Sequence, residues 1–390
     1  MNASFSDILI IGGGASGLTA ALAAAQSGAS VTVLEAGKKA GSKLLRTGNG
    51  RCNLSNTGDS STAYSGTNAA FAERILKHVT REETYAFFKS IGVILKSRDG
   101  WLYPYNDEAS FVRGALLERA EELHVRIRNN EFVKECGKDE SGFYAVSGNW
   151  TYRSRRLILA CGSPAGLAEN SVFFKGELAR SFGHTFLPFR SALAPLYVRN
   201  PRKELAGIRA NASVTLLADD SVIDREDGQV QFTSKGLSGI CVFNLAVKAD
   251  PYLQKGRKVR IVCDFAPDLK DLPGLKDIRE TDFIRSIVPE KLYGAVFSKL
   301  TLDEAGKLLH HLAFEVTGSA PLGEAQAASG GVLSEEIEDS TMMSRLVPGL
   351  YICGEMLDIV GKCGGWNLQF AWSGGISAGR SAAASLASDQ

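Results

Sequence analysis

The chain has 390 residues, enough for two or three domains and a large apolar core. Lys and Arg number 44 against 43 for Asp and Glu, so no overall field attracts DNA or an anionic membrane. The seven cysteines show no CxxC or zinc-finger spacing, which argues against a disulfide framework, a redox dithiol and a metal site. No signal peptide precedes Asp7, and no apolar run approaches the ~20 residues that span a bilayer. We therefore expect a cytoplasmic protein without membrane contact.

The most informative stretch is residues 7–35, which reads strand, glycine turn, helix, strand. The β-branched run Ile8–Ile11 suits a strand buried on both faces of a parallel sheet, and it leads into GxGxxG. An Ala-rich helix follows, whose amino end would face a pyrophosphate. The next strand, Val31–Leu34, ends at Glu35, whose carboxylate can accept hydrogen bonds from ribose hydroxyls and repels a 2′-phosphate. This predicts a Rossmann-type site for FAD or NAD, with cofactor-binding residues Gly12, Gly14, Ala15, Ser16, Gly17, Glu35 and Ala36.

Residues 36–56 are rich in Gly, Lys, Arg and Asn and lack an apolar period, so we expect an ordered loop after a short helical piece. Composition alone fits a solvated basic loop equally well. Glycine and asparagine beside two arginines favour a backbone that wraps a ligand, because glycine permits close approach and arginine supplies forked donors. These residues are Arg46, Gly48, Asn49, Gly50 and Arg51.

The middle of the chain continues the α/β pattern. Apolar periodicity predicts helices over residues 68–92 and 110–123, and residues 100–104 are interpreted as a packed aromatic turn. Strands are expected at Val125–Arg128, Phe143–Ser147 and Arg156–Ala160. The last of them ends in small residues, Cys161 and Gly162, which should lie beside the cofactor at the carboxyl edge of the sheet. No second GxGxxG occurs, so we expect no separate nicotinamide-binding domain.

After residue 190 the pattern changes. Short alternating runs up to residue 265 predict an antiparallel β domain, and the more charged residues 269–315 predict a smaller helical unit. A buried strand at Leu350–Ile352 then ends near Gly354 and Glu355.

The second informative stretch is residues 361–375, where Gly364 and Gly365 precede a helix that runs toward the C-terminus. The amino end of that helix, aimed at the O2/N1 edge of an isoalloxazine, would stabilise the negative charge of reduced flavin. The alternative is a glycine-opened helix that packs through Trp366 and Trp372. We favour the cofactor interpretation, because the first and last segments would then build one site.

Four motifs occur together: GGGASGL followed by Glu35, the block TGNGRCN at residues 47–53, the strand Leu159–Gly162, and LVPGLYICGEMLD with GGWNLQFAWSGG near the end. In this combination the chain resembles the bacterial BaiN-like (YhiN-like) FAD-dependent oxidoreductases. The glycine fingerprint is general among flavoproteins, whereas GRCN together with GGWNLQ is specific. Ser42 stands where this family commonly has arginine, and Trp366 where it commonly has tyrosine.

The resemblance implies tightly bound FAD, with the glycine motif and Glu35 on its ADP half. It also implies an α/β fold: a three-layer, Rossmann-like FAD-binding domain with a parallel sheet (1–190 and 340–390), interrupted by an antiparallel β-barrel-like domain (191–268 and 326–339) and a small helical domain (269–325). Further cofactor-binding residues implied by the resemblance are Lys43, Thr47, Gly48, Asn49, Gly50, Arg51, Cys52, Asn53, Val133, Ala160, Cys161, Gly162, Gly354, Glu355, Gly365, Trp366, Asn367, Leu368 and Gln369.

Three functions remain open. The first is an NAD(P)H-fed reductase in which FAD passes hydride to an activated C=C bond of a small or steroid-like substrate, with the nicotinamide binding transiently. The second, also implied by the resemblance, is reduction of uridine to dihydrouridine in large-subunit ribosomal RNA. Local basic clusters support it: Lys38, Lys39, Lys43, Arg46 and Arg51, then Arg153, Arg155 and Arg156. The third is a non-enzymatic flavin-bearing sensor or scaffold. The sequence leaves the oligomeric state open.

Reduction of a polarised C=C bond also needs a proton donor. The five histidines fall outside the cofactor motifs, whereas Cys52 and Cys363 fall within or beside them. Cys363 precedes a helix amino end and has Lys362 beside it, which would lower its pKa. We therefore predict Cys363 first and Cys52 second as the catalytic acid, against the alternative that both are inert buried thiols.

Overall fold

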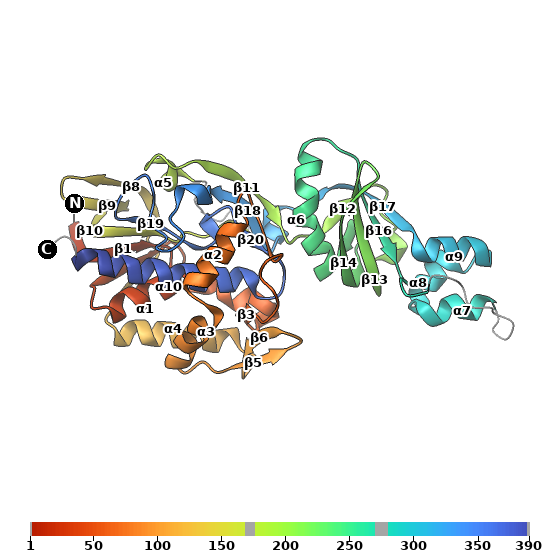
Figure 1. Cartoon of the computed structure of the whole chain (residues 1–390), viewed down its shortest axis with the longest axis horizontal. Coiled ribbons are helices and arrows are strands. Elements are labelled where there is room, and N and C mark those ends of the chain that lie inside the picture. The colour runs from red at the N-terminus through yellow and green to blue at the C-terminus, as the bar shows by residue number, and fades with distance from the viewer. Residues whose placement is uncertain (1, 168–175, 270–279, 388–390) are drawn as a thin grey trace. The chain divides into compact units, whose positions relative to one another are not determined.

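The computed structural model describes residues 2–167, 176–269 and 280–387, which form two compact units. Of the described residues, 2–164, 176–190 and 328–387 belong to unit 1. Residues 165–167, 191–269 and 280–327 belong to unit 2. Unit 1 contains both chain ends, so the chain leaves the unit and returns to it (Figure 1). Residues 328–339 lie in unit 1, whereas the sequence led us to expect them in the β-rich domain.

Unit 1 is built on a seven-stranded sheet with the order β7-β2-β1-β10-β9-β8, and β19 pairs with the second half of β10. Strands β7, β2, β1, β10 and β19 are parallel, whereas β9 and β8 are antiparallel additions. The strands are β1 (Asn2–Ile11), β2 (Val31–Glu35), β7 (Arg126–Asn129), β8 (Val133–Asp139), β9 (Gly142–Ser147), β10 (Trp150–Leu159) and β19 (Leu350–Ile352). The carboxyl-terminal part of β1, Ile8–Ile11, is at most 2% exposed, as its apolar run predicted.

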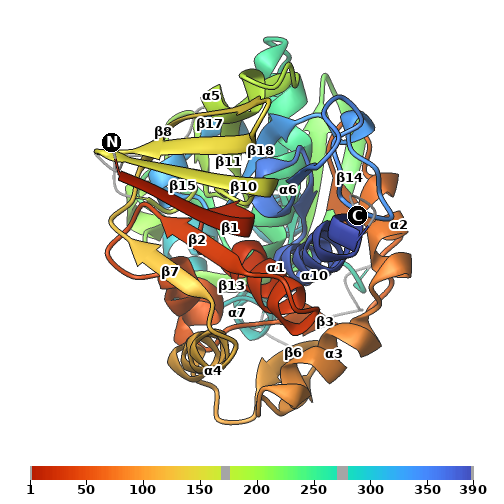
Figure 2. The same ribbon diagram turned by 90° about the vertical axis from the view of Figure 1, so that its left-hand side faces the viewer.

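Two helices, α1 (Ala15–Gln26) and α10 (Trp366–Leu386), pack along each other beside this sheet (Figure 2). They approach closely because α10 presents glycine at the contact. A β-carbon on Gly379 would lie 2.2 Å from the carbonyl oxygen of Ala20, and one on Gly375 would lie 2.3 Å from Thr19 Oγ1. The remaining helices of unit 1 are α2 (Ala70–His78), α3 (Arg81–Ser90), α4 (Ala109–Glu122) and α5 (Glu177–Arg180).

Residues 68–92 form two helices where we expected one helical stretch. The break falls at Thr80, whose hydroxyl accepts a hydrogen bond from Glu83 N at 3.2 Å, while Thr80 N donates to the Glu83 carboxylate at 3.0 Å. This capping box starts α3 afresh. The pattern is visible in the sequence as Thr80 followed three residues later by Glu83.

The interpretation of residues 100–104 as a turn is wrong. Trp101–Pro104 is strand β6, which pairs with β5 (Leu95–Arg98) and β3 (Ser55–Asn56). The turn lies one step earlier, at Asp99 and Gly100, which both have positive φ. Two further pairs of strands are β4 (Tyr64–Ser65) with β20 (Val360–Gly361) and β11 (Phe186–Ala192) with β18 (Ala327–Val332).

Unit 2 contains a closed antiparallel barrel with the order β12-β15-β14-β13-β16-β17. The strands are β12 (Leu196–Val198), β13 (Arg209–Ala218), β14 (Ser221–Phe232), β15 (Gly236–Ser238), β16 (Val259–Asp264) and β17 (Leu312–Ser319). Its helices are α6 (Ile240–Gln254), α7 (Glu280–Ile287), α8 (Glu290–Leu292), η3 (Tyr293–Phe297) and α9 (Leu302–His310). Short 3₁₀ segments of the chain are η1 (Ser42–Gly50), η2 (Lys203–Leu205), η4 (Leu322–Glu324), η5 (Ser334–Glu336) and η6 (Gly354–Met356).

The barrel confirms the predicted antiparallel β architecture, with two corrections. Helix α6 lies within the stretch that we expected to be β alone, and it buries Val242, Leu245 and Ala249 in the barrel's apolar core. Residues 312–315 were expected to be helical but begin β17, where Leu312, Phe314 and Val316 alternate inward. Part of the expected helical stretch, residues 270–279, lies outside the described residues.

Candidate functional site

The carboxyl ends of the parallel strands bring the predicted segments together at one edge of the sheet. The chain passes from β1 to β2 on one side and later to β10 on the other, so the strand order reverses between β1 and β10. Ligands of open α/β sheets bind at such a point. Gly12, directly after β1, has φ +107°, and a β-carbon there would lie 2.3 Å from the carbonyl oxygen of Ala160, directly after β10. Only glycine allows this approach.

The first turn of α1 borders open space. Gly14 caps the helix, and apart from its two chain neighbours no described residue has a heavy atom within 4 Å of the position that a β-carbon on Gly14 would take. The amides of the first helical turn, from Ala15 onward, have no acceptor within the helix and carry the positive end of its dipole. The turn therefore fits a diphosphate.

Glu35 lies at the end of β2 beside the glycine turn. Its Oε2 accepts a hydrogen bond from Gly13 N at 2.9 Å, and its Oε1 accepts one from Gly37 N at 2.6 Å. Each carboxylate oxygen keeps a further lone pair that can accept from a ribose hydroxyl. Nearby, Glu131 N donates to the carbonyl oxygen of Glu35 at 2.9 Å, two residues before the fully buried Val133. The residues present therefore fit the ADP half of FAD.

Three segments that are far apart in the sequence meet at the same edge, around an ion pair between Lys43 and Glu355. Lys43 Nζ in η1 lies 2.6 Å from Glu355 Oε2, just beyond β19, and 3.5 Å from Ser163 Oγ, just beyond β10. Glu355 Oε1 accepts a hydrogen bond from Ala328 N at 3.2 Å. The sequence analysis did not predict Ser163 as a site residue, although its position two residues after Cys161 indicated that it lies at the same edge of the sheet.

The GRCN block lies against the amino end of α10. With the Asn53 side-chain amide oriented so that its oxygen faces an N–H group, Asn53 Oδ1 accepts a hydrogen bond from Gly365 N at 3.2 Å and Asn53 Nδ2 donates to Ser55 O at 2.9 Å. Asn56 Nδ2 donates to Gly364 O at 2.8 Å. Preceding them, Thr47 is extended while Gly48 and Asn49 are left-handed, which breaks η1 into an irregular, largely exposed loop. The two ends of the chain thus form one surface.

Several residues implied to bind the cofactor point their side chains into the protein. Trp366 is 7% exposed and packs edge-on against Tyr64, with ring centroids 5.9 Å apart. The Asn367 side chain bonds both the N and the O of Gly361, each at 2.8 Å. Gln369 is 1% exposed, and its side chain makes hydrogen bonds with Ser55, Thr84 and Ser373 in the protein interior. The first-turn amides of α10, from Trp366 to Leu368, have no acceptor within the helix.

The two candidate acids differ in environment. Cys52 is fully buried with φ +58°, and burial raises its pKa to about 12, against an opposing hydrogen bond with Thr47. It therefore stays a neutral thiol at neutral pH. Cys363 is half-buried in the turn that leads into α10. This difference favours Cys363 over Cys52 as the residue that meets substrate, and both assignments stay predictions.

The two basic clusters are also unlike each other. Lys38, Lys39, Arg46 and Arg51 are exposed near the cofactor edge. The cluster on β10 is engaged by protein groups. Arg153 pairs with Asp139 at 3.0 Å, Arg155 lies 4.0 Å from Asp7, and Arg156 Nε donates to Ser385 Oγ at 2.7 Å. That cluster is held by ion pairs of Arg153 and Arg155 and by a hydrogen bond of Arg156 to α10.

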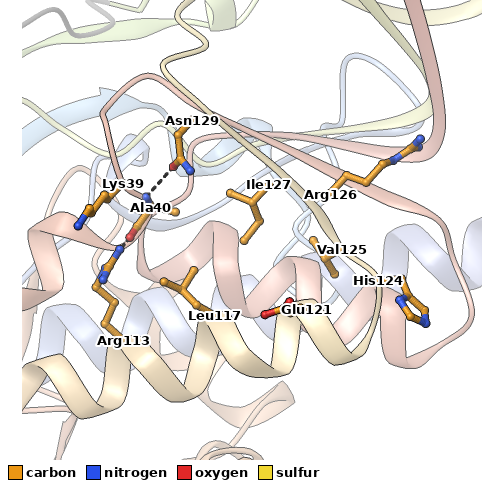
Figure 3. A pocket seen from close by; sticks show the side chains of 10 residues that line it. All are labelled: Lys39, Ala40, Arg113, Leu117, Glu121, His124, Val125, Arg126, Ile127 and Asn129. Carbon is orange, nitrogen blue, oxygen red and sulfur yellow. Dashed lines mark hydrogen bonds between the residues drawn. The ribbon is translucent and has the colours of Figure 1, made fainter.

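A surface pocket of about 540 Å³ lies between α4 and β7 (Figure 3). Leu117 and Ile127 lie in its middle, with Lys39 and Arg113 toward one end and His124 and Arg126 toward the other. The residues predicted to bind the cofactor lie elsewhere. Over the described ranges, no three His, Cys, Asp or Glu side chains gather as a metal site would need. In the same part of the chain, no helix has the length and apolar character to cross a bilayer.

Fold and site together define a Rossmann-type, FAD-binding flavoprotein. The chain belongs to the family of HI0933-like proteins, whose Rossmann-domain model matches residues 6–381. This family includes the relatives that the GRCN and GGWNLQ motifs pointed to, and the resemblance is thereby confirmed.

Two relatives align over almost the whole chain. The 3-dehydro-bile acid Δ(4,6)-reductase of Clostridium scindens is 35% identical over 401 residues, covering 96% of this chain and 98% of that protein. The ribosomal RNA dihydrouridine synthase of Escherichia coli is 29% identical over 394 residues, covering 94% and 95%. Among solved structures, quinol fumarate reductase FrdA of Escherichia coli matches with a TM-score of 0.53 at 13% identity, covering 100% of this chain and 72% of that one. The structural match concerns the fold alone.

Proposed function

We propose that this FAD-dependent oxidoreductase reduces an activated C=C bond of a small or steroid-like substrate, with NAD(P)H as the electron donor. The observation that carries the proposal is the 35% identity, over 96% of the chain, to a protein named as a bile acid reductase. Reduction adds a hydride to one carbon and a proton to the other, and bound flavin supplies the hydride chemistry that side chains lack.

The residues of this chain have three tasks in that reaction. The α1 turn and Glu35 hold the ADP half of the cofactor through helix amides and a carboxylate. The amides that open α10 carry a positive dipole end, which would stabilise the negative charge of a reduced flavin bound beside them. Cys363, just before those amides, is the predicted source of the proton.

A second candidate is reduction of uridine in ribosomal RNA. It is favoured by the 29% identity to the Escherichia coli synthase and by the exposed basic residues near the cofactor edge, Lys38, Lys39, Arg46 and Arg51. The chemistry is the same, because the C=C bond of uracil is also conjugated to a carbonyl. Higher identity to the bile acid reductase and the near-zero net charge place this candidate second.

The experiment is an anaerobic two-step assay on the FAD-loaded protein. NADH or NADPH should first bleach the flavin absorbance, and a 4-en-3-one steroid should then restore it. In parallel, the chain is expressed in an Escherichia coli strain without its ribosomal RNA dihydrouridine synthase, and dihydrouridine is measured in the ribosomal RNA.

Restoration of absorbance by the enone, without restored dihydrouridine, supports the first proposal. Restored dihydrouridine with no response to the enone replaces it by the second. A flavin that neither nicotinamide reduces, together with unrestored dihydrouridine, refutes both and favours the sensor or scaffold alternative.

A further inference from the structure

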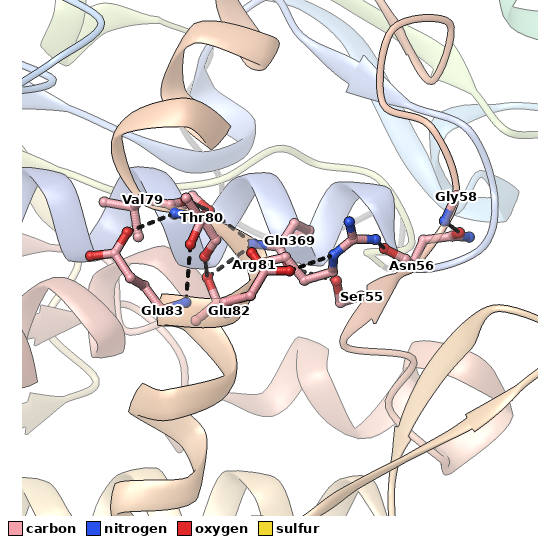
Figure 4. A network of polar contacts seen from close by, with 11 residues as sticks. Ser55, Asn56, Gly58, Val79, Thr80, Arg81, Glu82, Glu83 and Gln369 are labelled. Carbon is pink, nitrogen blue, oxygen red and sulfur yellow. Dashed lines mark hydrogen bonds and ion pairs between the residues drawn. The ribbon is translucent and has the colours of Figure 1, made fainter.

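Gln369 belongs to a buried polar network that joins three elements, β3, α3 and α10 (Figure 4). The side chains of Ser55 on β3, Thr84 on α3, and Gln369 and Ser373 on α10 are each no more than 3% exposed. Gln369 Nε2 donates to Thr84 Oγ1 and to Ser373 Oγ, both at 2.9 Å. Ser55 Oγ donates to Gln369 Oε1 at 2.5 Å.

The network requires an amide at this position. The Thr84 hydroxyl donates its hydrogen to Thr80 O at 3.0 Å, and the Ser373 hydroxyl donates to Val79 O at 2.9 Å. Both hydroxyl oxygens can therefore only accept, while the Ser55 hydroxyl needs an acceptor. A carboxamide offers two donor hydrogens on one atom and an acceptor on the other, and among side chains of this length only glutamine does so.

Further hydrogen bonds join the same segments at the amino end of α10. Ser55 follows Asn53 by two residues, and Asn53 accepts the Gly365 amide hydrogen bond at the start of α10. Asn56, next to Ser55, bonds Gly364 O, and its own carbonyl accepts from Arg81 Nη1 at 2.6 Å (Figure 4). A buried network in which every partner is satisfied holds its elements in one arrangement. The hydrogen bonds of Gln369 thus help to fix the distance between the GRCN block and the turn that opens α10.

We propose that Gln369 is a positioning residue: it fixes the GRCN block against the amino end of α10, and it acts on bound flavin through that arrangement without contacting it. This replaces the direct cofactor-binding role that the resemblance implied. The inference rests on FAD binding at this edge, as the proposed function requires, and it is independent of the substrate.

The sharpest probe is Gln369→Glu, which keeps the shape of the side chain and removes both donor hydrogens. The carboxylate would then face two hydroxyl oxygens whose hydrogens are already used. Thr84→Val is a milder probe, because it keeps the size of the side chain and removes one acceptor. Ser344→Ala is the matched control. Ser344 is 2% exposed and bonds His184 Nε2 at 2.8 Å, in a buried polar cluster of the same unit that lies outside the flavin site.

For each variant we would measure the melting temperature, the FAD dissociation constant and the two-electron midpoint potential of the bound flavin. Both network variants should weaken FAD binding at least about tenfold and shift the potential to more negative values, because reduced flavin loses more from a displaced helix end than oxidised flavin does. A tenfold difference between the two forms corresponds to about 30 mV. Ser344→Ala should lower the melting temperature and leave the potential unchanged.

Unchanged potential and FAD affinity in Gln369→Glu and Thr84→Val would overturn the inference, as would an equal shift in Ser344→Ala. If Gln369→Glu does not fold, Thr84→Val and Ser55→Ala decide by the same criteria. A protein that passes this test but is reoxidised by neither enone nor RNA contradicts the proposed function and leaves the role of Gln369 intact.

Discussion

Substitution of Gly14 by alanine separates the fold from cofactor binding. Gly14 has φ −81° and ψ −163°, which any residue can adopt. Apart from the two chain neighbours of Gly14, a methyl group there meets no heavy atom of the described residues within 4 Å. The apoprotein should lose only the small preference for glycine over alanine at a helix cap, below about 1 kcal/mol. The melting temperature of the apoprotein should therefore change little.

FAD binding should respond far more strongly, because the same open space is where a diphosphate would approach the amides of α1. A methyl group that keeps one phosphate oxygen from an amide costs a hydrogen bond to a charged group, about 1.5–3 kcal/mol. This corresponds to a roughly 10- to 150-fold rise in the dissociation constant. The assay is a titration of apoprotein with FAD, followed by flavin fluorescence.

Gly12→Ala is the contrasting variant two residues away. Its φ of +107° and the 2.3 Å approach to the Ala160 carbonyl oxygen predict that the sheet edge itself is disrupted, so the melting temperature and FAD binding should fall together. If Gly14→Ala binds FAD as tightly as the wild type, the diphosphate does not approach the helix at Gly14 and the reasoning is refuted.

Three further outcomes are expected. In stopped-flow, Cys363→Ala should leave flavin reduction by NAD(P)H intact and slow flavin reoxidation by substrate at least ~10²-fold. The control Cys241→Ala, in the barrel core, should change neither rate. Unchanged reoxidation in Cys363→Ala would eliminate Cys363 as the acid. Burial raises the pKa of Glu336, but hydrogen bonds from Thr185 and His184 outweigh burial and hold that pKa below 4.5. The ionised carboxylate therefore stabilises the fold above pH 4.5. This stabilisation is lost as the pH falls through the pKa of Glu336 in the folded protein. Melting curves of wild type and Glu336→Gln should therefore converge below pH 4.5, and a constant gap contradicts this. Trp372→Phe should lower the free energy of urea unfolding of the apoprotein by about 1–3 kcal/mol, because Leu54 O loses the fully buried indole donor at 3.1 Å. The control Trp150→Phe, at a side chain that is 38% exposed, should change that free energy by no more than about 0.5 kcal/mol. Equal effects of the two substitutions would contradict the role of the Trp372 hydrogen bond.

Local patterns in the chain were sufficient wherever a residue's role depends on its immediate neighbours. The strand, glycine turn, helix and second strand of residues 8–35 were predicted, because Gly12 and Glu35 act through backbone geometry and motif spacing. The break at Thr80 and the inward alternation of β17 were equally local, and they were missed because a longer helical pattern was preferred. Helix α6 was missed because its surroundings read as strands.

The tertiary structure alone decided which distant side chains meet and which way they point. The Lys43 and Glu355 pair joins residues 312 positions apart, and sequence spacing carries no information on such a distance. Gln369 stands in a motif that suggested cofactor contact, yet its side chain points inward, where it makes hydrogen bonds with Thr84 and Ser55. A helix period defines which residues share a face. What that face touches depends on the elements folded against it, and here these come from the opposite end of the chain.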